Sequence, residues 1–417
     1  MLPQESLPML ADEACRTADG GERPVSPGRL SAAVVVVVIA ALPALHAAHT
    51  SRSYGVESFK VNASDALIFR SAAELLAQGR SPYDVQVQRR HIAETWLDGQ
   101  DPPYSLPFAY PPNALPLFML CLVGPPRLGF VLFVAVGTLL MLAAAYRLAG
   151  RFSRHSWERT IIVVGTGFGG AAIFNAMLGQ TGAYLGAAVF AYAACYRKAP
   201  GWAGVALGLM AFKPQYALLL GVVALVDRQW RTVAAAAATF VACSVLSGLL
   251  FGFDQWAAFL DAVRSFNYTA DYMCNWIGIT HRLYPGELRS LYAAGTFVML
   301  IGVVGVAAYC ALDTRGASRS MRHLAVAIAL ATLVSPNTHP YDLIIWLVPV
   351  CVAAGARPRV PLWAAVFVAG FAVTVMLAMG VRWMLPLISC ALLVSAARSV
   401  WEDDSPSRID TVKQRAG

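Results

Sequence analysis

The amino-acid sequence predicts an all-α fold, in the form of a polytopic integral membrane protein with about twelve transmembrane helices. Of its 417 residues, 58% are hydrophobic and only 13% are charged, whereas soluble domains carry about 25% charged residues. Several apolar runs also approach the roughly 20 residues that a helix needs to cross a bilayer. These runs do not alternate in polarity, so we expect helices, which satisfy their own backbone hydrogen bonds in lipid, and not β-strands.

A single membrane domain is expected over residues 31–398. Two long polar stretches, 50–107 and 252–290, interrupt it and are expected to be extracytoplasmic loops. Residues 1–30 are polar and predict a disordered cytoplasmic tail, and residues 399–417 predict a second cytoplasmic tail. The candidate membrane segments are 31–49, 108–124, 128–147, 160–177, 181–196, 201–213, 215–226, 233–251, 291–311, 323–336, 342–356, 360–379 and 382–398.

The first apolar run, 31–49, has no small-residue cleavage signature behind it, so we interpret it as a retained anchor and not a signal peptide. Basic residues in the short loops then set the orientation, because cytoplasmic loops carry an excess of Lys and Arg. They place both tails inside and both long polar stretches outside. These residues are Arg197, Lys198, Arg228, Arg231, Arg315, Arg319, Arg322, Arg357 and Arg359.

Four further arginines, in the loop 147–159, also indicate a cytoplasmic position and conflict with a simple count of crossings. Two alternatives remain open. Either segment 108–124, which contains three prolines, is re-entrant, or residues 201–226 form one continuous helix and the four-arginine loop departs from the charge rule. Both give about twelve crossings. The first places Gln180, Lys213 and Gln215 on the outer side.

Composition and missing motifs exclude several classes of function. The net charge of +8 comes largely from arginines beside apolar segments, so we expect membrane lipids and no nucleic acid as partners. The eight cysteines are scattered singly, which predicts neither a disulfide framework nor a zinc site. The chain contains no G-x-x-x-x-G-K-[ST], D-x-D or H-E-x-x-H motif. No cofactor is expected, and a metal requirement is left open.

The stretch 62–79 predicts a helix at the membrane surface, with Asn62 as its N-cap and Gly79 ending it. Asp65 falls in the first turn, about 15 residues after the first membrane segment, so it lies close to the bilayer. A carboxylate there can serve as a general base. The alternative interpretation is that Asp65 only caps the helix.

Polar residues between or within the apolar segments are the other site candidates. Lys213, followed by the helix-breaking Pro214, lies in a long apolar run, where a lysine is costly unless it snorkels to the headgroups. Tyr110 is either a site residue or an interfacial anchor, and Gln180 belongs either to a site or to an ordinary turn. Further candidates are Gln215, Asn275, Arg282, Asn337, His339, Tyr341 and Asp342.

Five motifs in order resemble glycosyltransferase family 87, over roughly residues 31–380. They are "LLAQGRSPYD" (75–84), "FAYPPNALPLF" (108–118), "LGQTG" (178–182), "FKPQYALLL" (212–220) and "SPNTHPYDL" (335–343). The chain departs from the family in the loop 252–290, where an Asn-Gln-Ser is frequent but Trp276 and Ile277 follow Asn275. This departure leaves the acceptor open.

The resemblance implies a GT-C fold and an extracytoplasmic active site in a bacterial cytoplasmic membrane. It implies an inverting transfer of a sugar, typically mannose, from a polyprenyl-phosphate donor to a lipid or glycan acceptor. Asp65 matches the family's catalytic aspartate, and His339 matches a histidine that contacts the donor phosphate. Lys213 and Arg282 are further candidates to bind this phosphate, and the remaining polar candidates are expected to bind substrate. A lipid-linked sugar flippase and a non-catalytic membrane assembly protein are the alternatives.

Overall fold

The computed structural model describes residues 64–96, 99, 108–153, 155–265, 273–283, 288–313, 319–355, 362–378 and 385–402. Within these ranges the secondary structure is helical and contains no strand. The predicted anchor 31–49, the capping residue Asn62, the N-terminal tail, residues 403–417 of the C-terminal tail, and Arg154, Arg315, Arg357 and Arg359 lie outside the described residues. Residues 399–402, predicted to begin the C-terminal tail, instead continue helix α20 (Leu385–Glu402). The predicted all-α architecture is confirmed for the described part of the chain.

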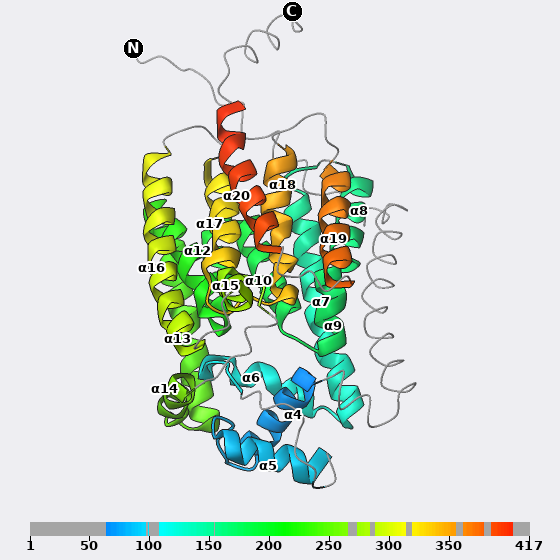
Figure 1. Ribbon diagram of the computed structural model, residues 1–417, viewed down its shortest axis with the longest axis vertical. Helices are drawn as coiled ribbons and strands as arrows, with labels where there is room; N and C mark the ends of the chain where they lie inside the picture. The colour runs from blue at the N-terminus through cyan, green and yellow to red at the C-terminus, as the bar shows by residue number, and fades with distance from the viewer. Residues whose placement is uncertain are drawn as a thin grey trace, which may run out of the picture.

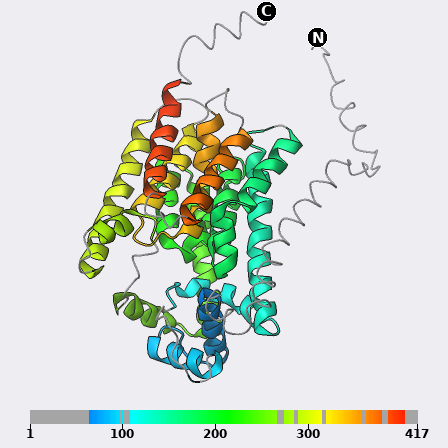
Figure 2. The ribbon, with the colours of Figure 1, turned by 45° about the vertical axis from the view of Figure 1, so that its right-hand side comes forward.

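Most helices run along the long axis of the molecule and pack side by side (Figure 1). Shorter helices lie together at one end of this bundle, away from the C-terminal end of α20, and remain there in the turned view of Figure 2. The bundle helices are α7 (Pro126–Ala149), α8 (Ser156–Gly167), α9 (Gly170–Leu178), α10 (Gly182–Cys195), α11 (Pro200–Leu209), α12 (Pro214–Val226), α13 (Trp230–Phe251), α16 (Leu288–Leu312), α17 (Arg319–Val334), α18 (Leu347–Gly355), α19 (Leu362–Ala378) and α20 (Leu385–Glu402).

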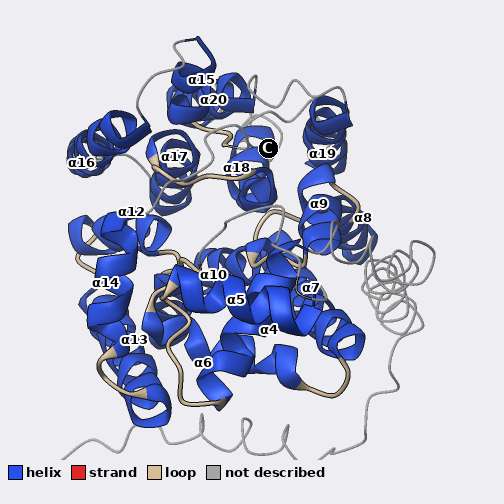
Figure 3. Cartoon of the chain, turned by 60° about the horizontal axis from the view of Figure 1, so that its bottom comes forward, coloured by secondary structure: helices blue, strands red, loops and turns tan. Residues whose placement is uncertain are grey.

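The short helices at the opposite end form a cap over the bundle, which Figure 3 views from that side. Helix α4 lies near the middle of this view, with α5 and α6 beside it, and α14 lies farther to the left. The cap consists of α4 (Ser64–Ala77), α5 (Val85–Trp96), η1 (Pro112–Ala114), α6 (Leu115–Phe118), η2 (Met119–Leu122) and α14 (Gln255–Ser265). The remaining short elements are η3 (Met210–Phe212), α15 (Trp276–Leu283) and η5 (Pro340–Trp346).

Three described helices are long and apolar enough to cross a bilayer, namely α7, α13 and the part of α16 from Ala293 to Leu312. The pair α8 and α9, bent by 49° at Phe168 and Gly169, makes a fourth if it is one span. A membrane protein is therefore supported, but the predicted twelve crossings are not established. Several predicted segments form helices shorter than a bilayer is thick, such as the 14-residue α10 and the 13-residue α12.

The predicted segment 108–124 is not a spanning helix. Its helical part, Pro112–Leu122, is broken into η1, α6 and η2, and at 1.5 Å per residue it is only about 16 Å long. Pro111, Pro112 and Pro116 lack the N–H groups that a continuous helix needs. The segment packs in the cap against α4, which fits the re-entrant alternative.

The stretch 201–226 also differs from one continuous helix. The guanidinium of Arg197, before α11, lies 3.5 Å from the carboxylate of Asp227, after α12. The chain therefore enters the bundle along α11, reverses at Lys213 and Pro214, and returns along α12. The guanidinium of Arg151 donates to the carbonyls of Ala193 and Tyr196, so the four-arginine loop lies at this same end.

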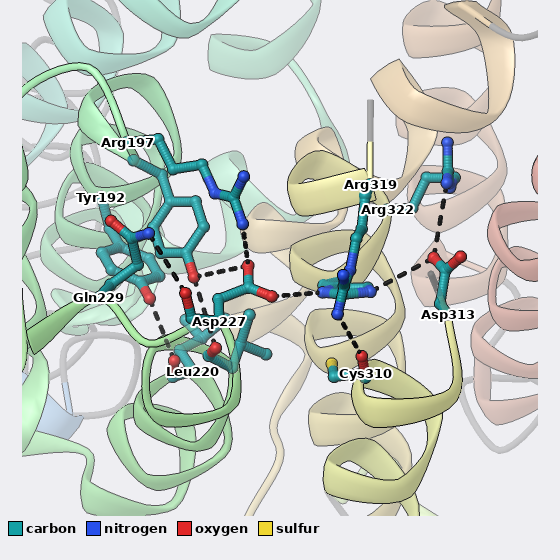
Figure 4. A network of polar contacts seen from close by, with 12 residues as sticks. Tyr192, Arg197, Leu220, Asp227, Gln229, Cys310, Asp313, Arg319 and Arg322 are labelled. Atoms are coloured by element: carbon teal, nitrogen blue, oxygen red, sulfur yellow. Dashed lines mark hydrogen bonds and ion pairs between the residues drawn. The ribbon is translucent and has the colours of Figure 1, made fainter. Parts of the chain in front are cut away.

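We call this end of the molecule, where residues 150–153, 196–199 and 227–229, Asp313 and the start of α17 lie, the basic end. A buried network joins its helices (Figure 4). Asp227 accepts from the hydroxyl of Tyr196 at 3.0 Å and lies 3.0 Å from Nδ1 of His323. The other ring nitrogen of His323 lies 3.3 Å from Asp313, which also faces Arg322. The network ties α10, α12, α16 and α17 together.

Candidate active site

Three polar turns, each at the end of a helix that begins or ends at the basic end, lie at a similar distance from it. The first turn, residues 179–181, precedes α10, the second contains Lys213 and precedes α12, and the third, residues 335–339, follows α17. Helices α10, α12 and α17 have 14, 13 and 16 residues. At 1.5 Å per residue, the turns therefore lie about 20–24 Å from the basic end. They meet within the bundle, and the cap lies beyond them.

Close backbone contacts hold the first turn against its neighbours. Gly179 has a φ of +69°, and a Cβ there would lie 2.8 Å from the Cβ of Ala66 in α4. A Cβ on Gly182 would lie 2.4 Å from the carbonyl oxygen of Tyr341. Both positions thus require glycine, because one has a left-handed backbone and both lack room for a side chain. They bring α4 and the start of η5, which directly follows the third turn, to the "LGQTG" motif.

Asp65 lies in the first turn of α4, whose apolar face is buried through Leu67, Ile68, Phe69 and Ala72. The carboxyl group is close to the amide of Gln180 and the ammonium of Lys213. Burial raises the pKa of Asp65 from 3.8 to about 6, although the hydrogen bond from Gln180 and the charge of Lys213 act in the opposite direction. Asp65 is therefore an ionisable group poised to accept a proton near neutral pH.

Tyr110 connects the start of the cap to the first turn. Its hydroxyl donates to Oε1 of Gln180 at 3.1 Å and lies 2.7 Å from Oγ1 of Thr181. Its ring packs edge-on against Phe69 of α4, with a centroid distance of 5.4 Å. Tyr110 and Gln180 thus lie beside Asp65 in one polar cluster.

Lys213 joins the second turn to the third. Its ammonium group forms a buried ion pair with Oδ1 of Asp342 and lies 4.8 Å from the ring centroid of Tyr341. The other oxygen of Asp342 accepts from the backbone N–H of His339 at 3.2 Å. The His339 ring stacks on Tyr341, with centroids 5.2 Å apart. The Asp342 carboxylate therefore holds both the Lys213 side chain and the backbone of the third turn at His339.

Further hydrogen bonds hold the third turn from two sides. Gln215 donates to the carbonyl of Asn337 at 3.4 Å. Asn275, at the start of α15, donates to the carbonyl of Ser335 at 2.6 Å and caps the helix by accepting from the N–H of Gly278. Oδ1 of Asn337 is buried and has no hydrogen-bond partner within the described part of the chain.

The sequence model of glycosyltransferase family 87 matches residues 108–336, just over half of the chain. The chain belongs to glycosyltransferase family 87. A search of curated proteins finds no match. The expected resemblance is thereby confirmed, and this family 87 protein is a membrane glycosyltransferase with a sugar donor and an acceptor as substrates. The match contains Tyr110, Gln180, Lys213, Gln215, Asn275 and Arg282.

Four other candidates of this family 87 protein, Asn337, His339, Tyr341 and Asp342, closely follow the matched region, and Asp65 precedes it. The fold nevertheless brings these residues to the matched motifs, as the ion pair of Lys213 and Asp342 shows. Arg282 is placed differently. It lies in the last turn of α15, seven residues and so about 10 Å along the helix from Asn275.

Besides Thr181, two side chains of this candidate site were not among the sequence candidates. The hydroxyl of Tyr216 lies 3.1 Å from Oγ1 of Thr338, and both residues are buried. Each directly follows a candidate, Gln215 or Asn337, inside a quoted motif, so the motifs themselves carried the signal. Within the described ranges, no group of three or more His, Cys, Asp or Glu side chains could hold a metal ion.

Proposed function

We propose that this family 87 glycosyltransferase has a GT-C fold and moves a sugar, typically mannose, from a polyprenyl-phosphate donor to an extracytoplasmic lipid or glycan acceptor. The proposal places it in a bacterial cytoplasmic membrane, with the basic end inside. The observation that carries the chemistry is the Asp65 carboxyl, whose pKa of about 6 suits a general base. It lies beside Lys213 and the three polar turns.

In the proposed reaction, Asp65 takes the proton of the acceptor hydroxyl as its oxygen attacks the anomeric carbon. The new glycosidic C–O bond forms while the bond between this carbon and the phosphate oxygen breaks, which inverts the configuration. The electron pair of the broken bond leaves with polyprenyl phosphate. Because a phosphate is already a good leaving group, the reaction needs no strong general acid. Lys213, Arg282 and His339 are proposed to bind this phosphate and to stabilise its growing charge.

The other polar groups are proposed to contact the substrates or to hold those that do. Asn337 has a buried oxygen with no partner within the described part of the chain, which suits a sugar hydroxyl as donor. Tyr341 presents an aromatic ring beside Lys213. Tyr110, Gln180, Gln215, Asn275 and Asp342 complete the proposed substrate-binding set.

An apolar hollow lies close to the third turn, which suits a donor that carries a lipid chain. It lies between α8, α9, α18 and α19, and the free space inside it is about 50 Å³. Leu343 and Ile344, which directly follow Asp342, line one side of it. A chain of isoprene units is too large to be enclosed there, but lying along this hollow it would have its phosphate end near the third turn.

The decisive experiment uses the purified protein in lipid nanodiscs with an extract of membrane lipids as acceptor. A radiolabelled sugar is offered either on polyprenyl phosphate or on a nucleotide. We expect labelled product only from the polyprenyl-phosphate donor, and none from the Asp65→Asn protein. Transfer directly from the nucleotide sugar, with no lipid carrier present, would overturn the proposed donor.

A further inference from the structure

The side-chain amide of Gln180 is fixed in one orientation. Its Oε1 accepts from the backbone N–H of Thr181 at 3.2 Å and from the hydroxyl of Tyr110 at 3.1 Å. A backbone N–H can only donate, so the atom facing it must be the oxygen of the amide. The NH₂ group of Gln180 is therefore held on the other side of the amide plane, where it can only donate.

Asp65 lies on that other side. Its carboxyl group accepts from the Gln180 side chain. The contact between Ala66 and Gly179 holds the two backbones together, because a Cβ at Gly179 would already clash with Ala66 and with the ring of Phe130. Gln180 is 6% exposed and Thr181 is fully buried, so these protein hydrogen bonds set the orientation of the amide.

We propose that Gln180 is a positioning residue for Asp65, with Tyr110 and the backbone of Thr181 as the clamp that aims its NH₂ group at the carboxylate. This inference rests on the proposed role of Asp65 as general base. The amide would occupy one carboxylate oxygen and leave the other for the acceptor hydroxyl. It would also favour the ionised carboxylate, which accepts more strongly than the carboxylic acid.

Two roles of Gln180 predict different results. If the amide binds substrate, its loss raises the KM of donor or acceptor and leaves the ionisation of the enzyme unchanged. If it positions Asp65, its loss removes a hydrogen bond from the charged form, so the pKa of the base rises. The pH profile of kcat/KM reports the pKa of the free enzyme and therefore separates the two.

The test is the pH profile of kcat/KM for the wild type and for Gln180→Leu, which keeps the bulk of the side chain. We expect the acid limb, with its midpoint at about 6 in the wild type, to move up by about one pH unit. Tyr110→Phe loosens the clamp but keeps the Thr181 hydrogen bond, so a smaller shift in the same direction is expected. If Gln180→Leu does not fold, Tyr110→Phe still provides the test.

Gln215→Leu is the matched control, because this glutamine also lies in a site motif but contacts the third turn and not Asp65. We expect it to leave the acid limb in place. An unshifted limb in both Gln180→Leu and Tyr110→Phe would overturn the positioning role. Full transfer activity in Asp65→Asn would instead overturn the base itself, so the two failures are distinguishable.

Discussion

Asp65 is a carboxyl group in surroundings that oppose its charge. Burial raises its pKa to about 6, so the folded protein binds the proton more tightly than the unfolded chain does. The ionised side chain therefore destabilises the folded state, and this cost grows as the pH rises from the unfolded pKa of 3.8 through about 6. Such a cost, at a carboxyl group beside Lys213 and the polar turns, is typical of a group kept for chemistry.

The variant Asp65→Asn should separate the stability cost of the buried charge from the role of Asp65 in sugar transfer. We expect transfer to fall by about 10²–10⁴-fold, as is common when a general base is lost. At neutral pH the Tm should be equal to that of the wild type or higher, because the neutral amide avoids the cost of the buried charge. Radiometric transfer assays and thermal unfolding in detergent measure the two effects.

Asp261→Asn is the control for this substitution, because the Asp261 side chain is 74% exposed on α14. It should change neither the rate nor the Tm. A lower Tm in Asp65→Asn, together with normal transfer, would make Asp65 a structural cap.

The ion pair of Lys213 and Asp342 differs from Asp65, because each of its two buried charges has an opposite charge beside it. The side chains are 8% and 0% exposed. Lys213→Met or Asp342→Leu alone should lower the free energy of unfolding by about 3–5 kcal/mol, since each leaves a buried charge without its partner. The double variant Lys213→Met, Asp342→Leu should recover most of this stability and remain inactive. Additive losses in this double-mutant cycle would contradict the coupling.

At this scale the sequence was informative about which residues matter, and less so about what each one touches. The motif containing Gln180 was identified, but Thr181 and Tyr110 fix its orientation through contacts 1 and 70 residues away. Lys213 and Asp342 are 129 residues apart. Pairings over such distances depend on how the helices pack, and no local pattern encodes them.

Helix α12 carries the second turn at one end and Asp227 at the other. Burial raises the pKa of Asp227, but the hydrogen bonds from His323 and Tyr196 and the charge of Arg197 outweigh this, so its pKa lies below the ordinary value. A lowered pKa means that Asp227 contributes stability above the unfolded pKa of 3.8 and loses it as the pH falls through the folded value. Asp227 is therefore ionised at neutral pH, where it can accept these hydrogen bonds.

Removing this carboxylate should loosen the helices that carry the polar turns. We expect Asp227→Asn to lower the free energy of unfolding by about 3 kcal/mol at neutral pH, because it leaves His323 facing a neutral amide in a buried position. Tyr196→Phe should cost about 1 kcal/mol. Exposed Asp254 provides the control, and Asp254→Asn should have no effect. An unchanged Tm in Asp227→Asn would show that packing alone holds this end.

Element boundaries were predicted best where apolar runs are uninterrupted. The segments 181–196 and 233–251 became α10 and α13 within three residues at each end. Predictions failed where glycine or proline divides a run, as in 160–177, which forms α8 and α9 with Gly167, Gly169 and Gly170 at the bend. The short helices α5 and α14 in the polar stretches were missed, because their polar faces resemble loop sequence.

On the scale of the whole molecule, exposed aromatic residues mark the membrane boundary at the basic end. Trp157, Trp202 and Trp230 are 56%, 71% and 63% exposed, and each lies in the first turn of α8, α11 or α13. Tryptophan at this position beside basic loops is typical of a membrane–water interface. From Trp230, α13 extends over 22 residues, or about 33 Å, which is enough to reach the other interface.

Cysteine labelling in intact cells tests the proposed orientation. In a background without the eight native cysteines, Arg80→Cys at the exposed turn after α4 should react with a membrane-impermeant maleimide. Lys198→Cys at the basic end should react only after permeabilisation. The reverse pattern would place the polar turns on the cytoplasmic side.

The number of crossings could not be predicted from apolar length alone. Hydropathy cannot distinguish a full span from two short helices that meet at a polar turn, as α11 and α12 do at Lys213. Apolar length also made 108–124 a candidate membrane segment, whereas its prolines break it into short helices in the cap.

The short bundle helices have a consequence for how substrates arrive. In the proposed orientation, the polar turns lie about 20–24 Å from the inner surface of a bilayer whose hydrocarbon core is about 30 Å thick. The proposed site would then lie below the outer surface, among the acyl chains. A lipid-linked donor would reach it by lateral diffusion, and its effective concentration would be its mole fraction in the bilayer or micelle. Adding detergent at constant donor and protein concentrations should therefore slow transfer in proportion to the dilution. A transfer rate that does not change with detergent would mean that the donor arrives from water. If the rate falls as expected, the donor concentration that matters to the enzyme is the number of donor molecules per membrane area.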